Sequence, residues 1–184
     1  KEMKVILITG VIGSGKDFYC KEYIKNHPDE RVKVMKFAAS LRDITEGIYN
    51  LPKGDETAYE AFKAIPENRL FMVRLGQNLK RVYGNDFFAF KVIDDIFDNK
   101  ESYDTFIVSD FRFPVEFWSF YKLFERNTHR VTILFADYHS DRYTIAPDQV
   151  SEQMAIWLKE QGLRDRQELS GEEFAELIKK YQEK

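Results

Sequence analysis

The feature that most constrains this chain is a glycine-rich segment near its start, residues 10–17, which read GVIGSGKD. The segment follows a short apolar run at residues 5–8 and leads into a stretch that is typical of a helix. Two glycines bracket four residues and a lysine follows the second glycine, a spacing that turns backbone N–H groups toward a phosphate. We therefore expect a buried strand, a phosphate-binding loop and a helix, in that order.

The residue types in this segment fit the binding of a nucleoside triphosphate. Gly10, Gly13 and Gly15 allow turn conformations and a close approach of the main chain to an anion. Lys16 would reach the terminal phosphates, and in the usual motif a Ser or Thr follows and contacts Mg²⁺, whereas here Asp17 follows. The alternative is a glycine-rich turn that binds nothing. The residues predicted to hold the nucleotide are Gly10, Ile12, Gly13, Ser14, Gly15, Lys16 and Asp17.

The composition narrows the class of protein. A chain of 184 residues with 43% hydrophobic and 32% charged residues fits one domain of an ordinary soluble enzyme. The net charge of −3 supplies no general basic field, so binding of polymeric nucleic acid is not expected. The single cysteine, Cys20, cannot form an internal disulfide and fits a reducing compartment. No apolar run is long enough to cross a membrane and no signal peptide is evident, so we expect a cytoplasmic protein.

Apolar runs alternate with helical patterns along the chain, which predicts an α/β fold with a mostly parallel sheet and helices on both faces. The expected strands are residues 4–9, 32–37, 105–108 and 130–136. Ligands of such sheets lie beyond the carboxyl ends of the strands. Residues 162–169 are charged and lack the run of branched apolar residues that is typical of a buried strand. This indicates that the sheet edge is truncated or differently connected. Residues 170–173, which read SGEE, form a capping-box pattern that opens the last helix.

A second signal lies at the end of the third expected strand, where Ser109 and Asp110 follow residues 105–108. An acidic residue that ends an apolar parallel strand beside a phosphate loop is where Mg²⁺ and its waters are held. Asp17 and Asp110 are therefore the predicted metal residues, acting through water. Arg112, two residues further on, is placed to meet a phosphate or a carboxylate.

Arginines elsewhere in the chain are candidates for binding an anionic substrate. Arg42 lies in the first turn of an expected helix, where a cation opposes the helix dipole, so it indicates either an anionic partner or a solvated side chain. The helix expected over residues 67–83 carries polar side chains spaced by three and four residues, which share one face. That face is either an ordinary solvated surface or one side of the binding site for an anionic substrate. Its members are Arg74, Gln77, Asn78 and Arg81.

The segment 137–147 is polar and follows the fourth expected strand, a place that suits a lid closing over the transferring phosphate. Arg142 is its predicted catalytic cation. Glu152 lies near the start of the next expected helix, either as a carboxylate favoured by the helix dipole or as part of the substrate site. Phe88 or Tyr83 is expected to stack on a base.

Taken together, these pieces resemble the bacteriophage-type deoxynucleoside monophosphate kinases. The likeness covers most of the chain from residue 4 to about residue 158. It rests on the Ser-Gly-Lys-Asp ending of the loop, on residues 37–42 (FAASLR), 74–77 (RLGQ), 84–87 (GNDF) and 108–116 (VSDFRFPVE), and on the Ser-Glu pair at 151–152. The loop also resembles that of animal-type phosphomevalonate kinase, in which Phe follows Gly-Lys-Asp as Phe18 does here. Most of the deoxynucleotide kinases have Thr at that position.

The resemblance implies a P-loop NTPase-type three-layer sandwich in a single domain, with a helical acceptor-binding insertion over about residues 41–98. It implies Mg²⁺-dependent phosphoryl transfer from ATP to a nucleoside or deoxynucleoside monophosphate, giving the diphosphate; a homodimer stays open. Catalysis would fall to Lys16, Asp17, Asp110, Arg112 and Arg142. The acceptor would be bound by Arg42, Arg74, Gln77, Arg81, Arg112 and Glu152. A phosphomevalonate-type kinase and a nucleotide-binding module without turnover are the alternatives.

Overall fold

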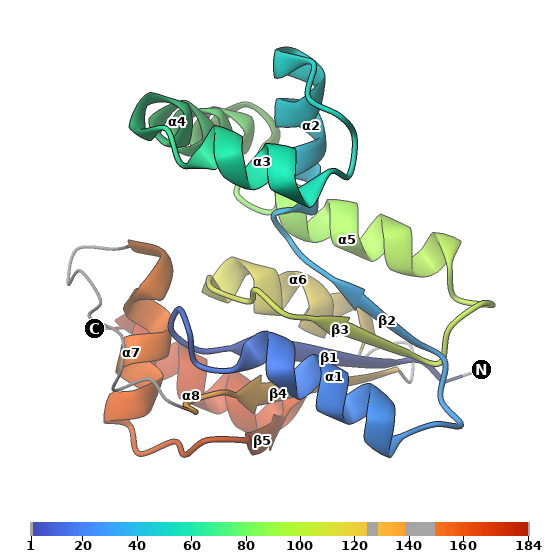
Figure 1. The fold of residues 1–184 in the computed structure, drawn as a ribbon. Coiled ribbons are helices and arrows are strands. Elements are labelled where there is room, and N and C mark those ends of the chain that lie inside the picture. Colours follow the sequence, from blue (N-terminus) through green and yellow to red (C-terminus); the bar gives the residue numbers. More distant parts are fainter. Residues whose placement is uncertain (1, 125–128, 139–149, 184) are drawn as a thin grey trace.

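A sheet of five strands, in the order β2-β3-β1-β4-β5, organises the fold (Figure 1). The computed structural model describes residues 2–124, 129–138 and 150–183. The first four strands along the chain are mutually parallel, and the fifth pairs antiparallel with β4. The mostly parallel α/β sheet predicted from the sequence is therefore confirmed. The strands are β1 (Lys4–Thr9), β2 (Val32–Met35), β3 (Thr105–Val108), β4 (Arg130–Phe135) and β5 (Gln167–Ser170).

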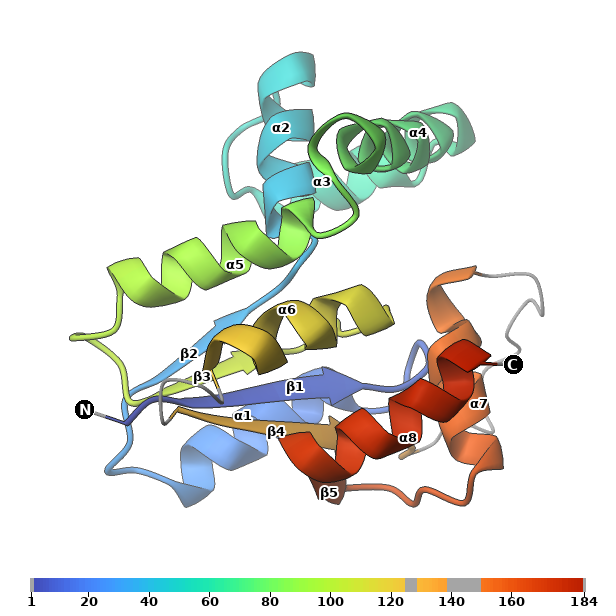
Figure 2. The ribbon, with the colours of Figure 1, turned by 180° about the vertical axis from the view of Figure 1, so that it is seen from behind.

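Helices cover both faces of the sheet (Figures 1 and 2). Successive residues of a strand point to opposite faces, so Val5 and Leu7 of β1 join one apolar core while Ile6 and Ile8 join the other. Helix α1 (Lys16–Asn26) packs on the second face through Cys20. The larger core lies on the first face, beneath α5 (Phe87–Asp98), α6 (Pro114–Phe124), α7 (Gln153–Glu160) and α8 (Gly171–Glu183). None of the helices in the described residues could cross a bilayer, since none is both long and apolar enough.

Three helices stand away from the sheet beyond the carboxyl end of β2: α2 (Ala39–Tyr49), α3 (Glu56–Lys63) and α4 (Pro66–Tyr83) (Figures 1 and 2). They enclose a small apolar cluster of their own, formed by Tyr59, Phe62 and Met72. The next helix, α5, returns to the main core through residues such as Ile96. The part of the predicted insertion that leaves the sheet is therefore α2 to α4, whereas α5 belongs to the central body.

The carboxyl-terminal edge differs from the sequence expectation, because residues 167–170 do form a strand. Its side chains are mostly exposed, and it adds to the sheet by backbone pairing, with Ser170 opposite Thr132. An edge strand of this kind needs few apolar side chains, so an apolar run was not a requirement. The predicted capping box that follows is confirmed, since the Ser170 backbone N–H donates to Glu173 Oε1 and the Glu173 N–H donates to Ser170 Oγ, both at 3.1 Å.

The stability of the larger core can be tested at Phe120 of α6, a fully buried ring that packs edge-on against Phe37 at 5.9 Å between centroids. We expect Phe120→Ala to lower the free energy of unfolding by about 3–5 kcal/mol, because it removes a large buried ring and leaves a cavity. Urea unfolding at equilibrium measures this. The matched control is Phe90→Ala, since Phe90 is 46% exposed; it should cost about 1 kcal/mol or less. Equal losses in the two variants would contradict this placement of Phe120.

Candidate functional site

The glycine-rich segment lies between β1 and α1 and closes on itself as a tight loop. Gly13 and Gly15 have φ angles of 75° and 92°, a left-handed conformation that residues with side chains rarely adopt. A Cβ on Gly10 would overlap the carbonyl oxygen of Ala136, so the loop passes directly against the end of β4. No side chain caps the N-terminus of α1, which leaves the N–H groups of its first turn available to an anion.

Lys16 is the cation of this loop. Its Nζ donates a hydrogen bond of 2.7 Å to the carbonyl oxygen of Gly10, so the side chain folds back across the loop. Burial lowers the pKa of Lys16 from 10.5 to about 8, and the nearby guanidinium of Arg112 acts in the same direction. The carboxylates of Glu152 and Asp110 act against this lowering. Four charged residues from three separate parts of the chain therefore lie together at the carboxyl ends of the strands. They are Lys16, Asp110, Arg112 and Glu152.

Asp110 is a buried residue just beyond the end of β3. Its Oδ1 accepts a hydrogen bond from the Phe37 N–H at 2.7 Å, and its Oδ2 accepts one from the Ala38 N–H at 3.0 Å. Asp17, in the first turn of α1, is exposed, and its Oδ1 lies 3.8 Å from Nζ of Lys36. The two predicted metal residues thus border the same turn, the one that follows β2.

Four buried polar atoms at this edge have no hydrogen-bond partner among the described residues. They lie at the ends of β1 and β3 and in the loop, and they are Thr9 Oγ1, Ser14 Oγ, Ser109 Oγ and Arg112 Nε. A buried polar atom without a partner is costly, so a cluster of such atoms indicates a ligand that satisfies them. Hydroxyl and guanidinium groups donate well to phosphate oxygens, and this set of donors therefore fits a phosphate-bearing ligand.

The same edge has limited capacity for a metal on its own. No group of three or more His, Cys, Asp or Glu side chains within the described ranges could hold a metal ion. Asp17 and Asp110 therefore fit Mg²⁺ only as part of a wider set of ligands. Mg²⁺ keeps several waters and commonly takes one or two carboxylates together with phosphate oxygens, which matches this arrangement.

Glu116 is a buried carboxyl group to which the sequence assigns no separate role. Its Oε1 accepts hydrogen bonds from the backbone N–H groups of Arg112, at 2.9 Å, and Phe113, at 3.0 Å. Burial raises the pKa of Glu116 to about 7, although these two hydrogen bonds act against the rise. Glu116 thereby fixes the turn that carries Arg112. The available signal was its position in the first turn of a helix that begins at Pro114, where carboxylates commonly cap backbone N–H groups.

Arg42 is partly buried and pairs with two carboxylates. Its Nε lies 3.0 Å from Glu46 Oε1, its Nη1 lies 2.7 Å from Glu56 Oε2, and its guanidinium lies 4.4 Å from the centre of the Tyr59 ring. Glu46 is buried and also accepts a hydrogen bond from the Gly54 N–H, whereas the side chain of Glu56 is 70% exposed. An arriving phosphate would therefore compete with Glu56.

The predicted polar face of α4 is exposed. Arg74, Gln77 and Arg81 make no hydrogen bond or ion pair with other residues in the part of the chain that the structure describes. Lys80 of the same helix lies with its Nζ 4.2 Å from the centre of the Phe113 ring, so α4 packs against the turn that carries Arg112. The structure leaves this face open to a ligand, but no contact joins its three polar side chains to the phosphate loop.

The remaining predicted residues have different outcomes. Of the two rings predicted as alternatives for stacking on a base, Phe88 is 7% exposed and packs in the main core, which leaves Tyr83. Tyr83 is 66% exposed and stacks on Phe87. Glu152 is buried at the end of the short 3-10 helix η3 (Val150–Glu152), near enough to act on Lys16. Arg142 lies outside the described residues, as does residue 139 onward of the predicted lid.

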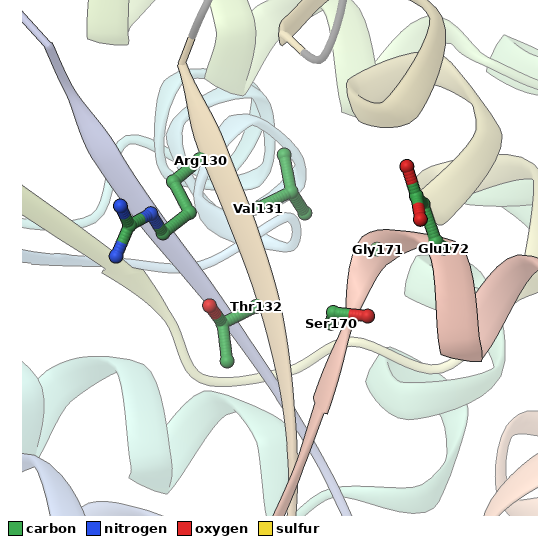
Figure 3. Close-up of a pocket in the computed structure, with 6 residues that line it drawn as sticks. All are labelled: Arg130, Val131, Thr132, Ser170, Gly171 and Glu172. Atoms are coloured by element: carbon green, nitrogen blue, oxygen red, sulfur yellow. The ribbon is translucent and has the colours of Figure 1, made fainter.

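A pocket of about 280 Å³ lies at the opposite end of the sheet, near the amino end of β4 and the carboxyl end of β5 (Figure 3). Its lining residues are Arg130, Val131, Thr132, Ser170, Gly171 and Glu172. Because the loop follows the carboxyl end of β1, this pocket is separate from the candidate site. No protein-family model matches the chain, and no curated protein matches it.

The charge state of Lys16 gives a testable pH dependence. We expect the affinity for a polyphosphate ligand to fall as the pH rises above about 8, because the lowered pKa of Lys16 leaves its amine neutral there and a bound anion must recharge it. Calorimetric titrations between about pH 7 and pH 10, in buffers of different ionisation enthalpy, would show proton uptake on binding. Lys16→Arg keeps its charge throughout this range and should remove the dependence. If the unchanged protein binds the ligand with the same affinity at every pH in this range, the role of the Lys16 amine is contradicted.

Proposed function

We propose that the protein transfers the terminal phosphoryl group of ATP to a nucleoside monophosphate, with deoxynucleoside monophosphates as the preferred acceptors. One observation carries the proposal: Lys16, Arg112 and Asp110 converge beside the glycine-rich loop and the uncapped start of α1, where buried hydroxyl groups of the loop and the neighbouring strand ends lack partners. Such a site supplies cations and N–H donors where a phosphate chain would lie. The ordered resemblance to phage-type deoxynucleotide kinases adds the class of acceptor.

The residues of this edge suit phosphoryl transfer because that reaction depends on alignment and on stabilisation of charge. Lys16 and the N–H groups of the loop would hold the donor phosphates, and Arg112 would neutralise charge that develops on the transferring group. Asp17 and Asp110 would hold Mg²⁺ through its waters; the ion, when bound, neutralises charge on the phosphate oxygens. Arg142, from the predicted lid, is proposed as a further cation. An acceptor that is already a phosphate needs no strong general base.

The acceptor would lie between the loop and the helices that stand off the sheet. Arg42 is the proposed contact for the acceptor phosphate, because its exposed partner, Glu56, can be displaced while the buried Glu46 keeps the guanidinium in place. Arg74, Gln77 and Arg81 would meet the rest of the acceptor from the open face of α4. Tyr83 is the exposed ring available to its base.

Labelled ATP and a panel of acceptors test this function. We expect labelled nucleoside diphosphate from at least one monophosphate, and a loss of at least about a thousandfold in rate in Lys16→Ala, because the transferring group loses a cation. Circular dichroism should show that the variant is folded. Lys21→Ala removes an exposed lysine from the same helix and should leave the rate unchanged. If phosphomevalonate alone is phosphorylated, the acceptor is not a nucleoside monophosphate. If ATP binds but no labelled product forms, the protein is a nucleotide-binding module without turnover.

The acceptor role of Arg42 is tested by steady-state kinetics. We expect Arg42→Ala to raise the KM for the acceptor about tenfold or more while the KM for ATP changes little, since the two phosphates occupy different sites. Glu56→Gln should act in the opposite direction and lower the acceptor KM, because it removes the competing carboxylate. Arg31→Ala serves as the control, since Arg31 pairs with Asp104 just before β3 begins. Equal changes in both KM values would remove Arg42 from the acceptor site.

A further inference from the structure

Phe18 is an apolar side chain that the proposed roles leave unused. It stands two residues after Lys16, in the first turn of α1, and it is 55% exposed. The sequence places it where most of the resembling deoxynucleotide kinases have Thr. A large exposed ring beside a phosphate loop has no packing explanation in the cores of this protein, because neither face of the sheet includes it.

Two groups from distant parts of the chain meet this ring. The Tyr138 ring lies 6.4 Å from it, centroid to centroid, and is inclined to it by 21°. The Arg166 guanidinium lies 5.8 Å from the ring centre and is held by both carboxylate oxygens of Glu22, one turn further along α1. Tyr138 is tied to the loop, because its backbone N–H donates to the Ser14 carbonyl oxygen at 2.9 Å. The aromatic pair therefore keeps a fixed relation to the phosphate loop.

The loop separates two kinds of surroundings. On the side of β3 and β2 lie Asp110, Arg112 and Lys36, and this is the side that Asp17 faces. On the side of β4 and β5 lie Tyr138 and Arg166, which face Phe18. The residues proposed to meet Mg²⁺ and the transferring phosphate thus lie on one side of the loop, and aromatic surface lies on the other. A nucleoside triphosphate has the same division, with a charged end that reacts and a planar base at the other end.

We propose that the exposed Phe18 ring, with Tyr138 beside it, is the stacking surface for the base of the donor nucleotide. The inference rests on the proposed function, since it requires that the phosphates of the donor lie in the loop; the buried, unpartnered Oγ of Ser14 supports that placement independently. The phosphate chain would run from Phe18 across the first-turn N–H groups toward Arg112. Aromatic rings hold a base through its π-face, and the Arg166 guanidinium adds a cation beside the stack.

Comparison of ATP with inorganic tripolyphosphate tests this inference, because tripolyphosphate carries the phosphate chain without a nucleoside. Calorimetry on the full chain with Mg²⁺ should show that Phe18→Thr weakens ATP binding by about ten- to a hundredfold and changes tripolyphosphate binding by less than about twofold. Phe18→Tyr keeps the ring and should bind ATP within about threefold of the unchanged protein. Phe90→Thr makes the same substitution at an exposed ring on α5 and should affect neither ligand.

The outcomes separate this inference from the proposed function. Unchanged ATP binding in Phe18→Thr would overturn the stacking role, and so would an equal loss of affinity for both ligands, which would mean that Phe18 shapes the loop. In either case, tripolyphosphate binding by the unchanged protein would still support the proposal that the loop binds phosphate. Failure of the unchanged protein to bind tripolyphosphate would contradict the loop and the stacking surface together.

Discussion

The two hydrogen bonds that the Asp110 carboxylate accepts from Phe37 and Ala38 hold the candidate site together. They fix the end of β3 to the turn after β2, which is the point where the chain leaves the sheet to form α2, α3 and α4. This buried carboxylate therefore helps to set the position of these helices relative to the glycine-rich loop. Parallel strands alone would align the ends of β1 and β3, but they would leave the direction of that exit unspecified.

Around this carboxylate, burial makes positive charge costly, and the nearby carboxylates of Asp110 and Glu152 offset that cost only in part. Burial and the nearby guanidinium of Arg112 lower the pKa of Lys16, which expresses the cost of charging its amine there. A polyanion would relieve that cost and would also supply acceptors for the unpartnered hydroxyls of Ser14 and Ser109. Burial and the unpartnered hydroxyls would therefore strengthen phosphate binding at this end of the sheet, which is a common arrangement at functional sites.

The parts of the structure that the sequence predicted well are those governed by local spacing. The loop from Gly10 to Lys16 and the capping box at Ser170 follow from a few adjacent residues, and both form as expected. The missed features depend on contacts distant in sequence. Strand β5 forms through backbone pairing with β4, which leaves no apolar signature, and Arg42 is neutralised by Glu56 from another helix. The choice between Phe88 and Tyr83 as a ring exposed to a ligand could not be made from the sequence, because residue type alone does not determine exposure.

Two adjacent residues in the first turn of α1 face different parts of the structure on either side of the loop. Successive residues of a helix are rotated by about 100°, so Asp17 and Phe18 point to different sides of the loop. Asp17 faces Lys36 beyond β2, and Phe18 faces Tyr138 beyond β4. A change at residue 18 can therefore alter the surface beside Tyr138 without disturbing Lys16 or Asp110. The exposed Phe18 ring is therefore compatible with the phosphate binding that we propose for the loop.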